Sequence, residues 1–105
     1  MFKATHPIQL KYLSELKQER DRQDARFGQQ DHTPERWCVI LGEEFGEVCR
    51  AVYDNTLDPA HLRSELIQVA AVALAWLEAT ERNPNTAQSG AFKQVFGQRY
   101  GLFCL

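Results

Sequence analysis

Two short acidic motifs, EEFGE and ELIQ, have the clearest capacity for chemistry in this chain. Both lie in segments with helical periodicity. Glu44 and Glu47 of the first motif continue a stripe of apolar residues, and Glu65 and Gln68 of the second share one face, a turn apart. Carboxylates on such faces resist burial unless some of them are protonated or a cation lies between them. Mg²⁺ takes carboxylate oxygens and retains water for a phosphate-bearing ligand, so the motifs predict a magnesium site.

The segment between the motifs decides whether they meet. The connection DNTLDP is short, which favours an antiparallel hairpin of two helices. Glu47 and Glu65 then lie roughly 12 and 11 Å from the turn along their helix axes, at about 1.5 Å per residue. Glu44 and Gln68 lie roughly 17 and 15 Å from it by the same measure. We therefore expect two level pairs that converge on one inward face.

Ordinary surface chemistry is the alternative for each glutamate taken singly. Glutamate is a good helix former, and Glu43 can pair with Arg36 or Arg50 on a solvated face without any function. This interpretation weakens for the whole cluster, because two separate helices would both have to place acids on a shared inward face. The corresponding alternative function is a structural helical oligomer whose glutamates form ion pairs between subunits.

Helical periodicity dominates the chain and predicts three long helices. They span residues 7 to about 24, 34 to about 54 and 59 to about 82. Thr33 with Pro34, and Asp58 with Pro59, have the capping and first-turn preferences that start the second and third helices. The charged half of the first helix, KQERDRQD, is predicted to be solvated. The third helix is apolar on almost every side over residues 66–77, so it needs partners on several faces.

These elements predict an all-α fold in which a helical hairpin is completed to a four-helix-bundle-like arrangement by oligomerisation. The 105 residues fit a single domain, with a short tail from about residue 84 that includes one short helix over about 91–98. A monomer of this size buries little apolar surface, so we expect a homodimer or homotetramer.

Composition and charge exclude several classes of protein. With 44% hydrophobic and 25% charged residues, the chain has the composition of a globular domain. Its net charge of -2 comes from interspersed signs, without the basic stripe that duplex nucleic acid requires. The apolar run over residues 69–77 is about half the length of a membrane span. The three cysteines lack CxxC spacing, and no signal peptide is evident. We expect a cytoplasmic protein with neither duplex nucleic acid nor membrane as a partner.

The two motifs, in this order, resemble those of the MazG-like nucleotide pyrophosphohydrolases, an all-α family with EExxE on one helix and ExxD on the next. The resemblance spans about residues 26–78 and includes RFGQQDHTPERW and LRSELIQVAAVALAWLEA. It implies hydrolysis of a nucleoside triphosphate to the monophosphate and pyrophosphate, with Mg²⁺, or alternatively Mn²⁺, as the cofactor. By motif match, Glu44, Glu47 and Glu65 would be metal ligands, and Glu43 would help bind metal or orient the attacking water.

Position 68 departs from the family pattern, because Gln68 stands where the family has its fourth metal ligand, an aspartate. An amide oxygen can coordinate a cation but brings no negative charge. We expect weakened magnesium binding that the substitution Gln68→Asp would tighten. The alternative function is a nucleotide- or metal-binding helical module with weakened catalysis.

Basic and aromatic side chains near the motifs are candidates for binding the substrate. Phosphates need basic groups, for which Arg26 and Lys93 are available, although no spacing selects them over the other basic residues. Phe27 and Trp37 flank the start of the second helix and can stack on a nucleobase. Trp37 also continues the apolar stripe of that helix, which favours core packing for its side chain.

Overall fold

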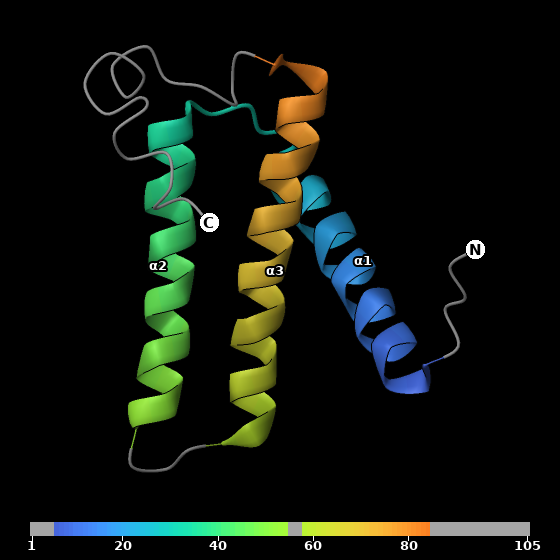
Figure 1. The fold of residues 1–105 in the computed structure, drawn as a ribbon, viewed down its shortest axis with the longest axis vertical. Helices are drawn as coiled ribbons and strands as arrows, with labels where there is room; N and C mark the ends of the chain where they lie inside the picture. The colour runs from blue at the N-terminus through green and yellow to red at the C-terminus, as the bar shows by residue number, and fades with distance from the viewer. Residues whose placement is uncertain (1–5, 55–57, 85–105) are drawn as a thin grey trace.

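The chain is all-helical in the computed structural model, which describes residues 6–54 and 58–84. Its helices are α1 (Pro7–Phe27), α2 (Pro34–Tyr53) and α3 (Pro59–Arg82), as drawn in Figure 1. The prediction of an all-α fold is confirmed. No helix in this part of the chain is both long and apolar enough to cross a membrane. The helix expected over residues 91–98 and the side chain of Lys93 lie outside the described residues.

Capping side chains start the helices where the sequence predicts them. Thr33 accepts a hydrogen bond from the backbone N–H of Arg36 at 3.3 Å, and Asp58 accepts one from the N–H of Ala60 at 3.0 Å. Each cap satisfies a backbone donor that the first turn of a helix leaves without a partner. The prolines that follow these caps occupy the first turn, where a missing N–H costs nothing.

The first helix is longer than predicted, because it continues through residues 25–27 instead of ending at Asp24. Nothing in Ala25, Arg26 or Phe27 opposes a helix, and the break comes at Gly28. Gly28 adopts a φ of 72°, a conformation that glycine reaches without steric cost, and its N–H bonds to the carbonyl of Asp24 at 2.9 Å. Arg26 and Phe27 therefore belong to the last turn of α1 and not to the connection.

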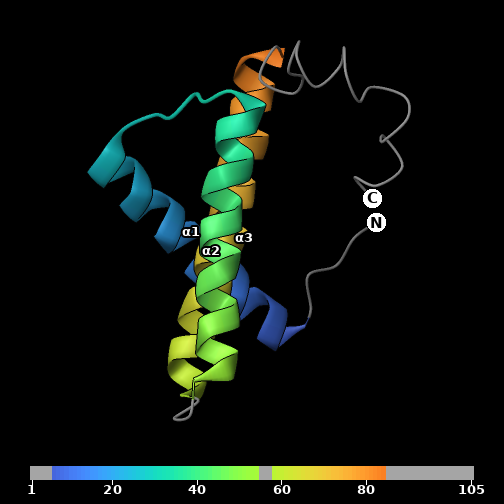
Figure 2. The same cartoon turned by 90° about the vertical axis from the view of Figure 1, so that its left-hand side faces the viewer.

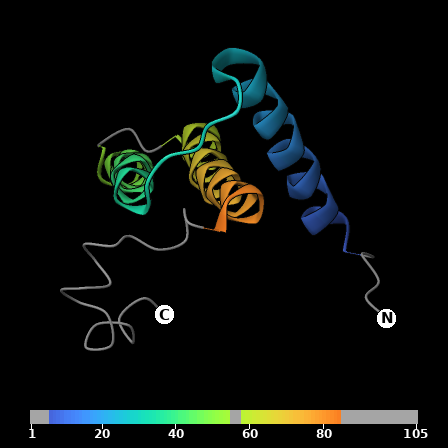
Figure 3. The same ribbon diagram turned by 90° about the horizontal axis from the view of Figure 1, so that it is seen from above.

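Helix α3 is the central element of the fold. It runs antiparallel to α2, which confirms the predicted hairpin, and α1 packs obliquely against another side of it (Figures 1 and 3). Figure 2 shows α2 lying along α3 while α1 projects at an angle. Extensive helix-to-helix contacts join α3 to α2 and α3 to α1. This position accounts for part of the apolar surface of α3, although Leu66 and Leu77 remain exposed.

The core lies between α2 and α3 and is built on Trp37, whose side chain is 1% exposed. Its ring stacks on Trp76 with the planes 9° apart and the centroids at 6.2 Å, and Val72 and Ala79 complete the cluster. The core packing predicted for Trp37 is confirmed. Burial is limited elsewhere, however, and many large apolar side chains remain exposed on all three helices.

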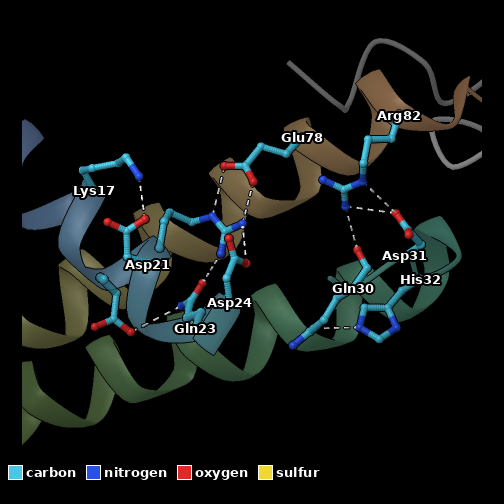
Figure 4. Close-up of polar contacts among 11 residues, drawn as sticks. Lys17, Asp21, Gln23, Asp24, Gln30, Asp31, His32, Glu78 and Arg82 are labelled. Atoms are coloured by element: carbon cyan, nitrogen blue, oxygen red, sulfur yellow. Dashed lines mark hydrogen bonds and ion pairs between the residues drawn. The ribbon is translucent and has the colours of Figure 1, made fainter. Parts of the chain in front are cut away.

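A buried arginine joins α1 to α3. Arg20 is 7% exposed, and its guanidinium donates two hydrogen bonds to the carboxylate of Glu78, at 3.1 and 2.5 Å. Gln23 and Asp24 each accept a further bond at 3.0 Å, and Figure 4 shows the three acceptors around the guanidinium. The prediction that the charged half of α1 is solvated is therefore wrong for this residue, because α3 supplies it with a partner.

Candidate metal and nucleotide site

A cavity of about 1050 Å³ is lined by all three helices and by the connection between α1 and α2. Glu44 from the first acidic motif lines it together with Glu65 and Gln68 from the second. The structure thus brings residues of both motifs to one cavity, as the hairpin geometry predicts. The volume is at the upper end of the range of ligand pockets, about 300–1,000 Å³.

The other two glutamates of the first motif do not line this cavity. Glu47 forms an ion pair with Arg50 on its own helix, and its side chain is 45% exposed. Glu43 is exposed to solvent. Glu44 faces α3. Glu43 lies one residue before it and Glu47 three residues after it, so the helical repeat turns both toward an edge of α2. Glu47 would have to release Arg50 before its carboxylate could join an ion held by Glu44 and Glu65.

The surroundings of Glu44 disfavour the charged form of its carboxyl group. Its burial raises its pKa, and the negative charges of Glu65 and Glu47 raise it further. Such a shift is typical of a carboxyl group that is partly buried beside other carboxylates.

The donor set fits a hard cation, because Glu44, Glu65 and Gln68 offer the carboxylate and amide oxygens that Mg²⁺ accepts. Within residues 6–54 and 58–84, no group of three or more His, Cys, Asp or Glu side chains is arranged to hold a metal ion. The Glu65 side chain is 17% exposed and lies 3.8 Å from Nε2 of His61, at the solvent side of the site.

Sequence reasoning missed two acidic residues that α1 contributes to the cavity: Asp24, which pairs with Arg20, and the more deeply buried Glu19. Its side chain is only 10% exposed, although the surrounding charged segment was predicted to be solvated. Burial acts to raise the pKa of Glu19, but hydrogen bonds from Arg22 and Gln68 outweigh this effect and lower it. The signal was present in the spacing, because Glu19 continues the stripe of Tyr12 and Leu16 along α1.

The cavity also has a basic and aromatic portion. Phe27 lines it with a 58% exposed ring, over which the Arg26 guanidinium lies at 5.0 Å from the centroid. Arg36 lines the cavity from the first turn of α2. Arg82 reaches across from α3, where it pairs with Asp31 at 3.0 Å (Figure 4). Of the residues predicted to bind substrate, Arg26 and Phe27 are thus accessible at the cavity.

Trp37 takes a different position from Phe27, because it contributes to the cavity wall from within the core. Its Nε1 atom is buried and has no hydrogen-bond partner among the described residues. A buried donor without an acceptor costs about 1–3 kcal/mol, so this wall carries a polar group that the described protein atoms leave unsatisfied.

No family model matches the chain, and neither a curated protein nor a solved structure shows significant similarity to it. Membership of the MazG-like family therefore stays a prediction that rests on the two motifs and the residues around them.

Proposed function

We propose that this protein is a magnesium-dependent nucleoside triphosphate pyrophosphohydrolase, which releases pyrophosphate and a nucleoside monophosphate. The observation that carries the proposal is the shared cavity of Glu44, Glu65 and Gln68 with several arginines. Acidic groups that can hold a cation beside basic groups that can bind phosphate suit a metal-complexed polyphosphate. The resemblance of the two motifs to the MazG-like family supports the same activity.

Each group in the cavity has a role in this proposal. Bound Mg²⁺ supplies charge stabilisation for phosphate oxygens and acidifies a water molecule. Glu44 and Glu65 hold the ion, and the amide oxygen of Gln68 is the third protein donor. Glu47 would be a further ligand if its carboxylate were released from Arg50. Glu43 assists from the edge of α2 by orienting the attacking water.

The remaining cavity residues bind the rest of the nucleotide. Arg26 and Arg36 contact phosphates that the cation leaves uncovered, because guanidinium groups bind phosphate oxygens in pairs. Phe27 offers an exposed ring on which a nucleobase stacks. Trp37 supports this wall from the core. The free thiols of Cys38 and Cys49 fit the reducing cytoplasm, where we place the reaction.

The direct test is pyrophosphate release from a panel of canonical and modified triphosphates, with Mg²⁺ and Mn²⁺ compared. The proposal predicts metal-dependent release of one pyrophosphate per monophosphate formed. Release of orthophosphate instead, or turnover that is unaffected by chelating the metal, would contradict it.

Two alternatives are separated by simpler measurements. A binding module with weakened catalysis would bind metal and nucleotide without releasing pyrophosphate. A structural helical oligomer, whose glutamates would pair with arginines of another subunit, would bind neither metal nor nucleotide; Glu47 is paired within its own helix, with Arg50. Under that alternative, Mg²⁺ plus nucleotide leaves the melting temperature unchanged, whereas a specific ligand raises it by mass action.

We also propose that two copies of the chain pack through the outer face of α2. This face consists of residues at helical spacing that point away from α3: Cys38, Gly42, Phe45, Cys49 and Val52. Phe45 is 59% exposed, and a Cβ added to Gly42 would meet no atom within 4 Å. Glycine inside a helix costs about 0.5–1 kcal/mol relative to alanine, a cost that close approach of a second helix would explain. A two-fold axis through this face would pair two hairpins into a four-helix arrangement.

The substitution Phe45→Glu is expected to convert the oligomer into a monomer, because it places a charge at the centre of the outer face of α2. Light scattering coupled to size-exclusion chromatography measures the mass directly. Ile8→Glu is the matched control, since Ile8 is similarly exposed, at 62%, but lies on α1. A monomeric parent protein, or a Phe45→Glu variant with the parent's mass, would show that this face is not the interface.

A further inference from the structure

Two ion pairs on neighbouring turns of α3 hold one wall of the cavity in place. Glu78 accepts two hydrogen bonds from the guanidinium of Arg20 on α1, at 3.1 and 2.5 Å. One turn further along α3, Arg82 donates to Asp31 at 3.0 Å and to the carbonyl of Gln30 at 3.1 Å. Figure 4 shows both contacts, with Glu78 and Arg82 one after the other along α3. The first contact fastens α1 to α3, and the second fastens the connection between α1 and α2.

The wall that these pairs hold is formed by the end of α1 and by the connection, residues 28–33. Phe27, Gly28, Gln29 and His32 of this segment line the cavity. Helix α1 packs on α3 but has few contacts with α2, whose residues also line the cavity. Gly28, with its φ of 72°, joins α1 to the connection at a point where glycine allows the chain to change direction. The position of the wall therefore depends on what joins it to α3.

Arg20 and Asp31 each have a second partner within their own segment. Arg20 donates to Asp24, four residues further along α1, at 3.0 Å. Asp31 accepts a hydrogen bond from the side chain of Gln29 at 2.7 Å. Both charged groups would therefore keep a polar partner if they lost their contacts with α3.

Glu78 and Arg82 are suitable partners for each other. They lie four residues apart on α3, and an acid four residues before a base is the favourable order for an ion pair within a helix. Hydrogen bonds from Arg20 are the main cause of the lowered pKa of Glu78, and the positive charge of Arg82 contributes to it. The two side chains thus already interact while each is bound to a partner from another segment.

We infer that the end of α1 and the connection form a movable wall of the cavity, which opens when the two ion pairs switch partners. In the closed arrangement Glu78 binds Arg20, and Arg82 binds Asp31. In the open arrangement Glu78 binds Arg82, while Arg20 and Asp31 keep the partners in their own segments. Because every charged group has a partner in both arrangements, opening leaves no charge uncompensated. A ligand that touches both the connection and α2 would favour the closed arrangement.

Hydrogen exchange of the full-length protein, followed by mass spectrometry on peptides from α1 and from the connection, tests this inference. Asp31→Ala frees Arg82 to bind Glu78, so it is expected to speed exchange by about five-fold or more in both segments. Arg82→Gln breaks the same contact from its other end but provides no competitor for Arg20, so only the connection is expected to exchange faster. Two independent ion pairs predict instead that both variants leave α1 unchanged.

The double variant that combines Asp31→Ala with Arg82→Gln gives the sharpest comparison. Switching of partners predicts that the parent's exchange rate is restored in α1, because no cation then competes for Glu78, while the connection still exchanges fast. Asp21→Ala is the control, since it removes an equal charge and an ion pair with Lys17 in which the side chains are 62% and 73% exposed. It is expected to change exchange in either segment by less than about two-fold.

Three results would overturn the inference: faster exchange of α1 in both single variants, faster exchange of α1 in neither, or a double variant whose α1 exchanges as fast as in Asp31→Ala. Thermal melting followed by circular dichroism establishes that each variant is folded, so that a change in one segment is local. None of these measurements involves metal, nucleotide or turnover, so their outcome is independent of the proposed function.

Discussion

Replacing Glu44 with glutamine is expected to lower pyrophosphate release by about 100-fold or more, the size of effect seen when one charge-stabilising group is removed from an active site. The same change is expected to make the metal-free protein more stable. Glutamine keeps the shape of the side chain but removes a negative charge that is held next to Glu65 and Glu47. The measurements are steady-state turnover with Mg²⁺ and thermal unfolding in the presence of a chelator.

The predicted gain in stability of Glu44→Gln should depend on pH, and the pKa of Glu44 fixes the direction of this dependence. The pKa of Glu44 is raised above its ordinary value of 4.5, first by burial and then by neighbouring charges. The folded protein therefore binds this proton more tightly than the unfolded chain, and stability falls as pH rises through the interval above 4.5. In Glu44→Gln this loss disappears, so the difference in stability between variant and parent should grow from acidic to neutral pH and then level off.

Glu81→Gln is the control for the Glu44 experiment, because it removes an equal charge from an exposed position near the end of α3. It is expected to change neither turnover nor the pH profile of stability. A Glu44→Gln variant that keeps the parent's activity, or that loses stability at neutral pH, would count against a strained acidic site at this position.

The substitution Arg20→Met is expected to destabilise the protein by about 2–4 kcal/mol, because it leaves Glu78 without the charge that compensates it. Methionine retains much of the apolar stem of the arginine, so the loss of stability reports the hydrogen bonds that join Arg20 of α1 to Glu78 of α3. Urea unfolding at neutral pH measures it. Lys17→Ala removes an ion pair with both side chains largely exposed and is expected to cost less than about 0.5 kcal/mol.

The loss of stability on acidification tests the contact between Arg20 and Glu78 independently. Hydrogen bonds from Arg20 hold the pKa of Glu78 below its ordinary value of 4.5, in spite of partial burial. A group with a lowered pKa contributes stability above pH 4.5, which is lost as the pH falls and the carboxylate takes up a proton. Arg20→Met should therefore lose less stability than the parent on acidification. Equal losses in both proteins would show that Glu78 is not held by Arg20 in solution.

The hairpin that carries the motifs was accessible to sequence reasoning because its signals are local. Thr33 and Asp58 cap their helices through contacts only two or three residues away, and the prolines after them restrict the first turn. The inward orientation of Glu44 and Glu65 also followed from periodicity within each helix, since each continues an apolar stripe. Such features do not depend on the rest of the molecule.

The contribution of α1 to the cavity and to the packing could not be predicted from the sequence, because it depends on contacts between distant parts of the chain. Arg20 reads as a solvated residue in a run of charges, and only the position of Glu78 on α3 makes its burial favourable. Glu19 is similar, since its 10% exposed side chain lines a cavity whose other walls come from α2 and α3. The end of α1 was misplaced for a different reason: the three residues before Gly28 neither favour nor oppose a helix strongly enough to fix its boundary.

A crystal structure grown with Mn²⁺ and a triphosphate analogue that resists cleavage between its α and β phosphates is the most direct test of the central claim. The account predicts an anomalous scattering peak for Mn²⁺ between Glu44 and Glu65, with the Gln68 amide oxygen and phosphate oxygens among its ligands. Nucleotide bound elsewhere on the protein, with the carboxylates of α2 and α3 free of metal at saturating Mn²⁺, would contradict it.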